Sequence, residues 1–207
     1  QYDASLEWYL GEADLVSVAL FKKDVQDLIA PRTVFDVVPG FESLGVLAFT
    51  RPENTGSSRI RGVEAGVQQS LDFLPGLLSG LGIIANYTFS DGDTDSGAPV
   101  IGLSRHSYNL IGFYEKAGLT ARVAYNWKSS RTVGFTGTDS RPNIIAAVGQ
   151  LDASVGYDIT ESIAINLGMV NLLPTDSAIK TFNVIPEAVN AYELNERQFI
   201  LTLRARF

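Results

Sequence analysis

The stretch Leu119–Lys128 reads Leu-Thr-Ala-Arg-Val-Ala-Tyr-Asn-Trp-Lys, and its apolar and polar residues alternate with a period of two. Successive side chains of a β-strand point to opposite faces of a sheet, so this period indicates a strand with one apolar face. That face would carry Leu119, Ala121, Val123, Tyr125 and Trp127.

The same alternation recurs along the whole chain. No segment keeps a 3.6-residue period over ten positions, so no long helix is expected. The longest uncharged stretch, residues 73–90, contains Pro75 and Gly76 and then alternates, which favours a turn and a strand over a membrane helix. The facing of residues 14–23 and 105–116 stays open. The nine expected strands are 2–10, 14–23, 57–73, 81–90, 105–116, 119–130, 148–158, 163–172 and 196–207.

The connections between these strands alternate between short and long. The short ones are 11–13, 74–80, 117–118 and 159–162, and the long ones are 24–56, 91–104, 131–147 and 173–195. All long loops therefore lie at one end of the sheet, as in outer-membrane barrels with short periplasmic turns and long extracellular loops. The pattern predicts an all-β, transmembrane, antiparallel β-barrel fold with extracellular loops near 24–56, 91–104, 131–147 and 173–195.

The composition excludes several classes of protein. Of the 207 residues 45% are hydrophobic and 19% are charged, which is too apolar for a disordered chain. A net charge of −7 argues against a nucleic-acid partner. The absence of cysteine excludes a disulfide scaffold and a cysteine-based zinc site.

The strand count points to part of a larger barrel. Nine is odd, whereas bacterial single-chain barrels have even numbers of strands. The chain begins at Gln1 rather than at a methionine, and it ends on an alternating strand at Phe207. We therefore expect the C-terminal portion of a barrel whose N-terminal portion is missing.

Seven segments carry a more specific signal: 54–64 (NTGSSRIRGVE), 68–82 (QQSLDFLPGLLSGLG), 85–90 (ANYTFS), 102–116 (GLSRHSYNLIGFYEK), 121–128 (ARVAYNWK), 149–157 (GQLDASVGY) and 170–172 (VNL). Together they resemble the late barrel of TonB-dependent receptors. The similarity is to the proteobacterial branch that includes maltodextrin-type and other carbohydrate receptors.

The resemblance implies a nutrient receptor in the outer membrane of a Gram-negative bacterium, without enzymatic activity or a cofactor. Residues 1–207 would then supply the last nine of about 22 strands, which surround a plug domain not visible in this chain. Energy would come from the TonB-ExbB-ExbD complex acting through that plug. Lipopolysaccharide and other outer-membrane lipids would surround the barrel. The barrel-assembly machinery would read the C-terminal signal Phe199, Leu201, Leu203, Ala205 and Phe207.

Polar residues of the alternating strands are expected to face the lumen, where they would bond the plug and water. They are Glu64, Gln68, Asn86, Arg122, Asn126, Asp152, Asn166, Arg204 and Arg206. The ligand candidates near the outer rim are Asn86, Arg105 and Asn126, joined by the loop aromatics Phe135 and Tyr192. Neutral amides suit sugar hydroxyls, whereas a ferric siderophore would prefer a more basic vestibule. The prediction is therefore an imported oligosaccharide, with a ferric siderophore as the alternative.

Two further groups offer chemistry. Asp91, Asp93 and Asp95 have D-x-D-x-D spacing, which suits calcium, but Gly102 stands where an EF-hand has its bidentate glutamate. A solvated acidic loop is therefore the favoured interpretation, and no metal site is predicted. His106, the single histidine, has no nucleophile or metal-ligand spacing around it, which favours a polar rim residue.

Two other architectures remain open. One is a small self-contained outer-membrane barrel of about eight or ten strands, structural or enzymatic. The other is a soluble lipid-binding barrel, whose apolar side chains would point inward.

Overall fold

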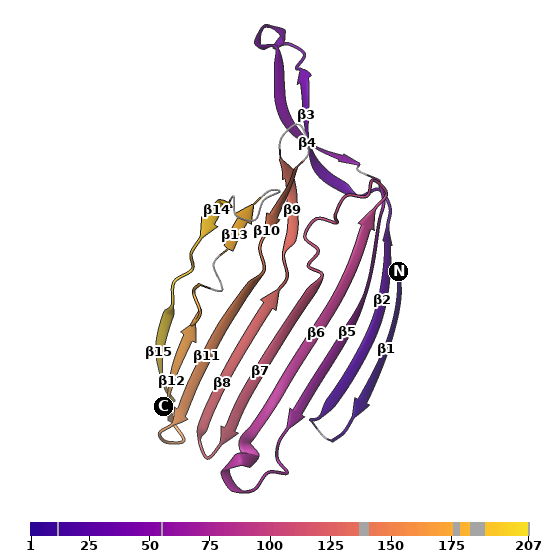
Figure 1. The fold of residues 1–207 in the computed structure, drawn as a ribbon. Coiled ribbons are helices and arrows are strands. Elements are labelled where there is room, and N and C mark those ends of the chain that lie inside the picture. Colours follow the sequence, from indigo (N-terminus) through magenta and orange to yellow (C-terminus); the bar gives the residue numbers. More distant parts are fainter. Residues whose placement is uncertain (12, 55, 137–140, 176–178, 183–188, 207) are drawn as a thin grey trace.

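The computed structural model describes residues 1–11, 13–54, 56–136, 141–175, 179–182 and 189–206. Nine strands form one sheet in the order β1-β2-β5-β6-β7-β8-β11-β12-β15, and every neighbouring pair is antiparallel. Figure 1 shows these strands side by side, with the long connections gathered at one end. Their bounds are β1 Tyr2–Tyr9, β2 Leu15–Val25, β5 Ser58–Ser70, β6 Leu81–Thr94, β7 His106–Lys116, β8 Leu119–Lys128, β11 Val148–Asp158, β12 Ile163–Val170 and β15 Gln198–Ala205. All nine expected strands are confirmed.

The expected long loops contain six additional short strands. β3 (Ile29–Val37) and β4 (Val46–Asn54) form a separate hairpin that projects beyond the sheet in Figure 1. A second small sheet joins β9 (Arg131–Thr136), β10 (Arg141–Ile145), β13 (Ile179–Phe182) and β14 (Val189–Glu193). The predicted nine barrel strands are therefore present, and the long loops add six short strands because they pair with themselves or with one another.

The helical content is limited to two short 3₁₀ segments in the described ranges. η1 (Glu42–Leu44) closes the tip of the β3–β4 hairpin, and η2 (Gly76–Gly80) lies in the turn between β5 and β6. At the hairpin tip the Gly40 N–H donates to the Glu42 carboxylate over 2.9 Å, which lowers the pKa of Glu42. None of the helices in the described part of the chain is long and apolar enough to cross a membrane.

Cross-strand register places the alternating apolar residues of all nine strands on one face, which we call the apolar face. One row across it pairs Leu6 with Val18, and Val18 with Ala65. Another row runs from Ala121 through Val155 to Leu167 and Leu201. The register also settles the two open strands, since Val16, Val18, Leu20, Tyr108, Leu110 and Tyr114 all lie on the apolar face.

The opposite face, here the polar face, carries the residues expected to line the lumen. Glu64 lies opposite Thr88, Asn166 opposite Thr202, and Arg204 opposite Ala164. The separation of the two faces therefore follows the period of two in the sequence.

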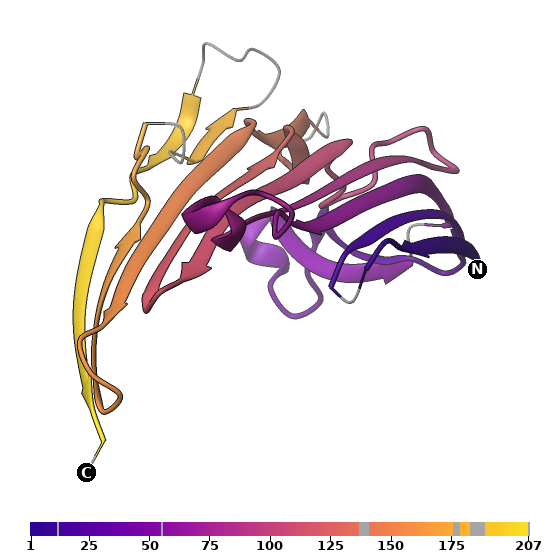
Figure 2. The same cartoon turned by 90° about the horizontal axis from the view of Figure 1, so that it is seen from below.

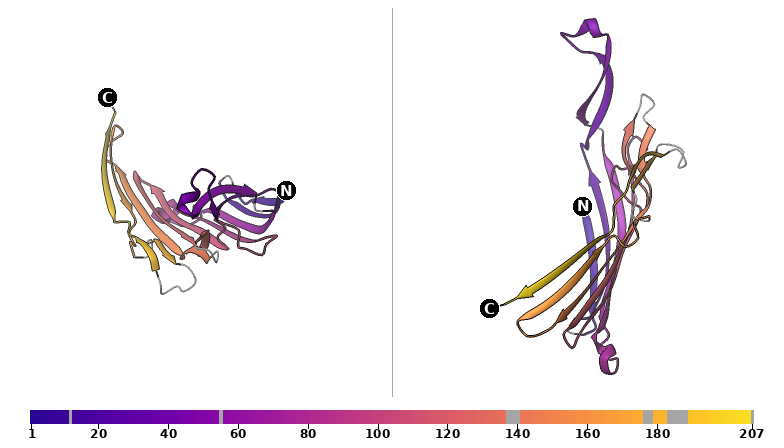
Figure 3. Two further views of the ribbon diagram at one scale, coloured as in Figure 1. Left: turned by 90° about the horizontal axis from the view of Figure 1, so that it is seen from above. Right: turned by 90° about the vertical axis from the view of Figure 1, so that its left-hand side faces the viewer.

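The sheet is a single curved layer without a core of its own (Figures 2 and 3). Ile111 is the one buried hydrophobic side chain among the described residues. Large apolar side chains such as Leu20, Val123 and Leu203 are instead 54%, 50% and 68% exposed on the apolar face. An apolar surface of this extent is stable in the hydrocarbon core of a membrane. In that environment every backbone N–H and C=O group must also be hydrogen-bonded, which requires a closed sheet.

The two edges of the sheet are open. β1 pairs with β2 alone and β15 pairs with β12 alone within the described residues. A small self-contained barrel would pair its first and last strands, so this sheet contradicts that alternative for residues 1–207.

A candidate ligand surface on the polar face

A row of side-chain amides crosses four neighbouring strands on the polar face. Asn86 of β6 lies opposite Asn109 of β7, Asn109 lies opposite Asn126 of β8, and Asn126 lies opposite Gln150 of β11. Residues directly opposite one another in an antiparallel sheet have Cβ atoms about 5 Å apart and share a face. We call these four residues the amide row.

The amide row lines a hollow of about 460 Å³. Thr88, Ser107 and Lys128 add two hydroxyls and one ammonium to its lining. Ser107 is the register partner of both Thr88 and Lys128, so these groups form a second polar row next to the amides. Lys128 is the single charged residue of the lining, and the surface therefore combines many neutral donors and acceptors with little charge.

One end of the amide row is fixed by an aspartate. Gln150 Nε2 donates to both carboxylate oxygens of Asp152 over 3.0 Å. Asp152 Oδ1 also accepts the backbone N–H of Asn171 over 2.8 Å. Asn171 is 3% exposed and has a positive φ of 59°, so this contact ties the end of β12 to β11 beside the hollow. The side-chain amide oxygen of Gln150 therefore points away from Asp152.

The structure brings two of the five predicted ligand residues together. Asn86 and Asn126 both line the hollow. Arg105 does not, because its guanidinium lies 5.6 Å from the ring centroid of Phe89, on the apolar face, and lines a separate hollow of about 230 Å³.

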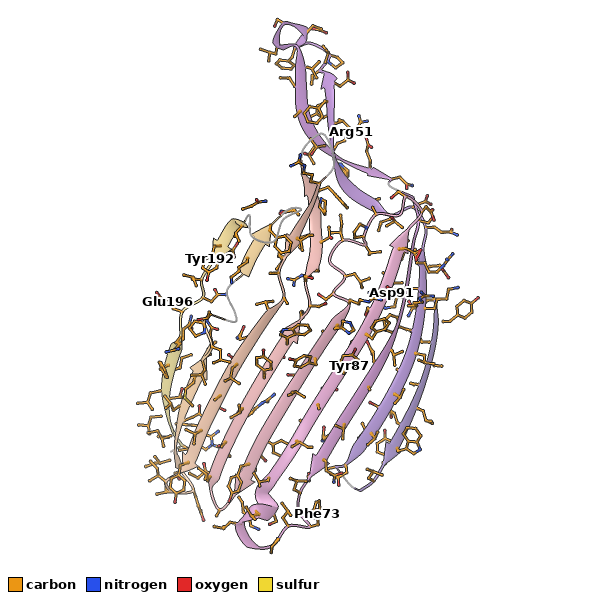
Figure 4. The ribbon with its side chains drawn as sticks, in the orientation of Figure 1. Arg51, Phe73, Tyr87, Asp91, Tyr192 and Glu196 are labelled. Atoms are coloured by element: carbon orange, nitrogen blue, oxygen red, sulfur yellow. The ribbon has the colours of Figure 1, made fainter. Side chains whose placement is uncertain are left out.

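The two loop aromatics lie in the small outer sheet. Phe135 belongs to β9, and Tyr192 belongs to β14 with Lys180 Nζ 5.7 Å from its ring centroid. Figure 4 shows Tyr192 above the C-terminal strands, towards the opposite edge of the sheet from Asp91. Their predicted ligand role stays a prediction.

Sequence reasoning missed Asn109 and Gln150. Asn109 lies in the strand whose facing was open, and Gln150 lies near the start of the expected strand 148–158 and was not singled out. The two-residue turn at Ala117 and Gly118 contained the missing signal, because a hairpin that pairs Lys116 with Leu119 also pairs Asn109 with Asn126.

The acidic loop has other partners in the structure. Asp91 Oδ2 accepts from Arg61 over 3.1 Å, and Asp95 Oδ2 accepts the Ser57 N–H over 3.1 Å. Within the described ranges, no group of three or more His, Cys, Asp or Glu side chains could hold a metal ion.

His106 lies on the apolar face, at the long-loop end of β7. Its Nδ1 is 2.7 Å from the hydroxyl of Tyr87, and its ring lies 5.3 Å from that of Phe89. Tyr108 stacks on Trp127 in the same band, with ring centroids 5.2 Å apart. These rings match the aromatic girdle expected at a membrane interface.

The predicted assembly signal also lies on the apolar face. Phe199, Leu201, Leu203 and Ala205 are opposite Met169, Leu167, Ile165 and Ile163 of β12. Phe207 lies outside the described residues.

Comparison with known proteins identifies the family. The family described as "TonB dependent receptor-like, beta-barrel" matches residues 1–172. The chain belongs to this family. TonB-dependent receptors are outer-membrane transport receptors, which confirms the predicted location in a Gram-negative outer membrane and the expectation that the chain is not an enzyme.

Solved structures of TonB-dependent receptors share the fold. The ferric-catecholate import receptor Fiu from E. coli superposes with a TM-score of 0.66 at 18% identity, over 99% of this chain and 27% of that one. The ferric enterobactin receptor PfeA from Pseudomonas aeruginosa gives 0.68 at 16% identity, over 98% and 30%. The copper transporter OprC gives 0.67 at 16% identity, over 99% and 30%. No curated protein matches the chain.

The chain thus spans less than a third of the length of these neighbours. Their names refer to ferric siderophores and copper, and none of them supports the narrower expectation of a carbohydrate branch. That expectation stays a prediction.

Proposed function

We propose that this chain is a ligand-contacting part of the barrel of a nutrient importer, in which the amide row and its hollow bind an uncharged, hydroxyl-rich ligand such as an oligosaccharide. Import would draw on the TonB-ExbB-ExbD complex through a plug domain that contacts the same polar face. The long loops would deliver the ligand to the hollow from the cell exterior.

The single observation that carries the ligand class is the alignment of four amides in one cross-strand row. Each amide offers both a donor and an acceptor, which is what a sugar hydroxyl requires. Repeated amides at strand spacing of about 5 Å also fit a ligand whose hydroxyls repeat along its length. The hollow has one lysine, so it offers little attraction to an anionic ligand.

A ferric siderophore is the second candidate, and a specific observation favours it. Fiu and PfeA, which have this fold, are named for ferric catecholates and ferric enterobactin. Lys128 in the hollow could then face a catecholate oxygen.

Equilibrium binding separates the two candidates. The full-length receptor that contains this chain would be titrated with maltoheptaose and with a ferric tris-catecholate in detergent. For the double variant Asn109→Leu/Asn126→Leu we expect maltoheptaose affinity to fall at least about tenfold, because two amides that could hydrogen-bond the sugar hydroxyls are lost from the row.

Asn166→Leu is the matched control. Asn166 is an amide on the same face, in β12 opposite Thr202, and does not line the hollow. Loss of binding in the control as well would point to general damage to the barrel. Tight binding of the ferric complex, weakened by Lys128→Gln, would reject the oligosaccharide and favour the siderophore.

A further inference from the structure

The apolar face has a hollow of about 440 Å³ at its short-turn end. Its walls come from two successive rows that cross β6, β7 and β8 on this face. One row contains Leu81, Tyr114 and Ala121, and the next contains Ile83, Gly112 and Val123. We call this hollow the Gly112 groove.

A glycine produces the groove. Gly112 lies opposite Ile83 on one side and Val123 on the other, and a Cβ atom built on it has nothing within 4 Å. Ile83 and Val123 therefore stand apart across two strand spacings, or about 10 Å between the backbones of β6 and β8. The gap between them is almost entirely apolar, so its natural occupant in a membrane is a hydrocarbon chain.

The turn below the groove is apolar as well. The Leu71 N–H donates to the Leu81 carbonyl oxygen over 2.8 Å, and Leu71 extends the groove wall towards the turn between β5 and β6. Three large apolar side chains of this turn are more than half exposed: Phe73, Leu77 and Leu78. Figure 4 shows Phe73 at the end of the sheet opposite to Asp91. Apolar side chains gathered next to a lipid-facing surface indicate that the turn contacts the membrane.

The height of the sheet places this turn at the inner boundary of the bilayer. From Leu81 to Phe89 the apolar face of β6 spans eight residue steps, or about 27 Å along the strand. At a strand tilt of about 40° this gives roughly 21 Å of height, whereas the apolar band of outer-membrane barrels is about 25 Å tall. The next residue of this face on the outer side is Asp91, which is ion-paired with Arg61 over 3.1 Å. The remaining few ångströms of the apolar band therefore fall at the turn.

A cation lies at this inner boundary. Lys116 follows Tyr114 on the apolar face, two residues further towards the turn. Its ammonium donates to the Gly76 carbonyl oxygen over 2.7 Å and to the Ser79 hydroxyl. A Cβ atom on Gly80 would lie 2.6 Å from the Lys116 Cβ, so the lysine packs directly against the turn.

The charge of Lys116 is not neutralised by these contacts. Both acceptor oxygens are neutral, and none of the ion pairs within the described ranges involves Lys116. The neighbouring Glu115 belongs to the polar face, where it lies opposite Thr120. An ammonium has three N–H donors, so one donor remains for a further acceptor.

The groove and the cation complement each other as parts of one lipid site. Lipid tails are as apolar as the protein surface, so apolar contact alone favours no particular position in a membrane. A groove adds close packing along one chain, and a cation adds a charge-assisted hydrogen bond to a phosphate. At the same tilt Lys116 lies about 5 Å below Tyr114, so a phosphate at its ammonium leaves the attached chain at the entrance of the groove.

We propose that the Gly112 groove and Lys116 together bind one glycerophospholipid of the periplasmic leaflet. An acyl chain lies over Gly112, and the phosphate accepts a hydrogen bond from the Lys116 ammonium. The exposed side chains of the turn lie in the headgroup region beside this lipid. The amide row lies on the opposite face of the sheet, so failure of either proposal leaves the other intact.

Native mass spectrometry of the full-length receptor that contains this chain tests the site, with palmitoyl-oleoyl phosphatidylglycerol as the probe. Gly112→Leu fills the groove and Lys116→Gln removes the charge. We expect each variant to bind the probe at least about fivefold more weakly, because packing or the phosphate contact is lost. Lys116→Arg keeps the charge and should retain most of the affinity.

Two matched controls carry the same kinds of change elsewhere on the apolar face. Ala65→Leu adds similar bulk in β5, where Ala65 lies between Val18 and Tyr87. Lys22→Gln removes the same charge at the long-loop end. Both controls should bind the probe like the wild type. Equal weakening in the controls and in Lys116→Arg would assign the loss to general damage of the barrel and reject the site.

Photocrosslinking gives the position of the bound chain. Phosphatidylglycerol with a diazirine in one acyl chain should label peptides of β6, β7 and β8 around Gly112 in preference to the rest of the barrel. Even labelling of the whole apolar face would overturn the proposal, because it would show only a general lipid coat.

Three further results would overturn the proposal. The first is wild-type affinity in the double variant Gly112→Leu/Lys116→Gln. The second is equal binding of diacylglycerol, which has the chains but lacks the phosphate. The third is displacement of the probe by inorganic phosphate at comparable concentrations, which would assign Lys116 to a free anion.

Discussion

Two glycines of the polar face make room for aromatic rings on the neighbouring strand. Gly62 lies opposite Phe21, and Gly82 lies opposite Phe113. A Cβ atom built on either glycine would overlap the facing ring. Each phenylalanine ring can therefore lie over the facing glycine, in the space that a side chain at that position would fill.

Gly82→Ala should therefore destabilise the barrel, by about 1–3 kcal/mol, because Phe113 must leave its position. Gly112→Ala is the matched control, since a Cβ there has no atom within 4 Å and its strand is adjacent. Urea unfolding of the receptor refolded in lipid vesicles would measure both. Equal midpoints for the two variants would contradict the packing role assigned to Gly82.

Some residues of the amide row could be predicted from the sequence and others could not. Asn86 and Asn126 could be placed on the polar face because their strands alternate cleanly. Asn109 could not, because Tyr108, Asn109, Leu110 and Ile111 give two acceptable faces. Arg105 lies outside the hollow, beside the Phe89 ring, and its predicted ligand role stays a prediction.

Among the elements, the β7–β8 hairpin depends on its turn. Ala117 and Gly118 both have positive φ, at 54° and 76°, as a two-residue turn of this hand requires. Glycine accepts this conformation freely, but alanine meets a steric cost of about 1–2 kcal/mol.

Ala117→Gly should consequently stabilise the hairpin, by about 1 kcal/mol. Ala121→Gly, in the middle of β8, should have the opposite effect, because glycine in a strand interior gains backbone freedom on unfolding and loses side-chain packing. The urea midpoint again provides the measurement. A lower midpoint for Ala117→Gly would show that the positive φ of Ala117 carries no strain.

The strands of the membrane sheet could be predicted and those of the loops could not. The lipid boundary enforces a strict period of two on the former, which makes it visible in sequence. The loop strands lie outside that boundary, so apolar and polar residues can occupy either of their faces. These strands are β3, β4, β9, β10, β13 and β14. Their pairing, such as Val37 with Val46 in β3 and β4, depends on loop closure rather than on an alternating pattern.

The molecule as a whole depends for its stability on the surrounding lipid bilayer rather than on a buried core. A soluble domain of 207 residues would bury a core, whereas here the described apolar side chains are mostly exposed on one face. A charged side chain introduced on that face should therefore strongly destabilise the membrane-inserted barrel. The same charge on the adjacent residue, which faces the opposite side of the sheet, should not.

Val123→Arg should destabilise the membrane-inserted receptor by about 2–4 kcal/mol, the cost of arginine near the bilayer midplane. Ala124→Arg, on the polar face of the same strand, is expected to change the stability by far less. Folding yield and unfolding midpoint in vesicles would report both. Similar losses for the two variants would contradict the assignment of the lipid-facing side.

The β3–β4 hairpin is attached to the sheet at a single point. Its two ends leave from Val25 and Ser58, which are themselves register partners in β2 and β5. Lengthening or shortening such an insertion costs little, since doubling a loop adds only about 0.6 kcal/mol of closure entropy. Mutations can therefore change the length and sequence of this exposed hairpin without changing the nine-stranded sheet that anchors it. Such changes would allow a receptor to avoid antibodies or phages that bind the hairpin.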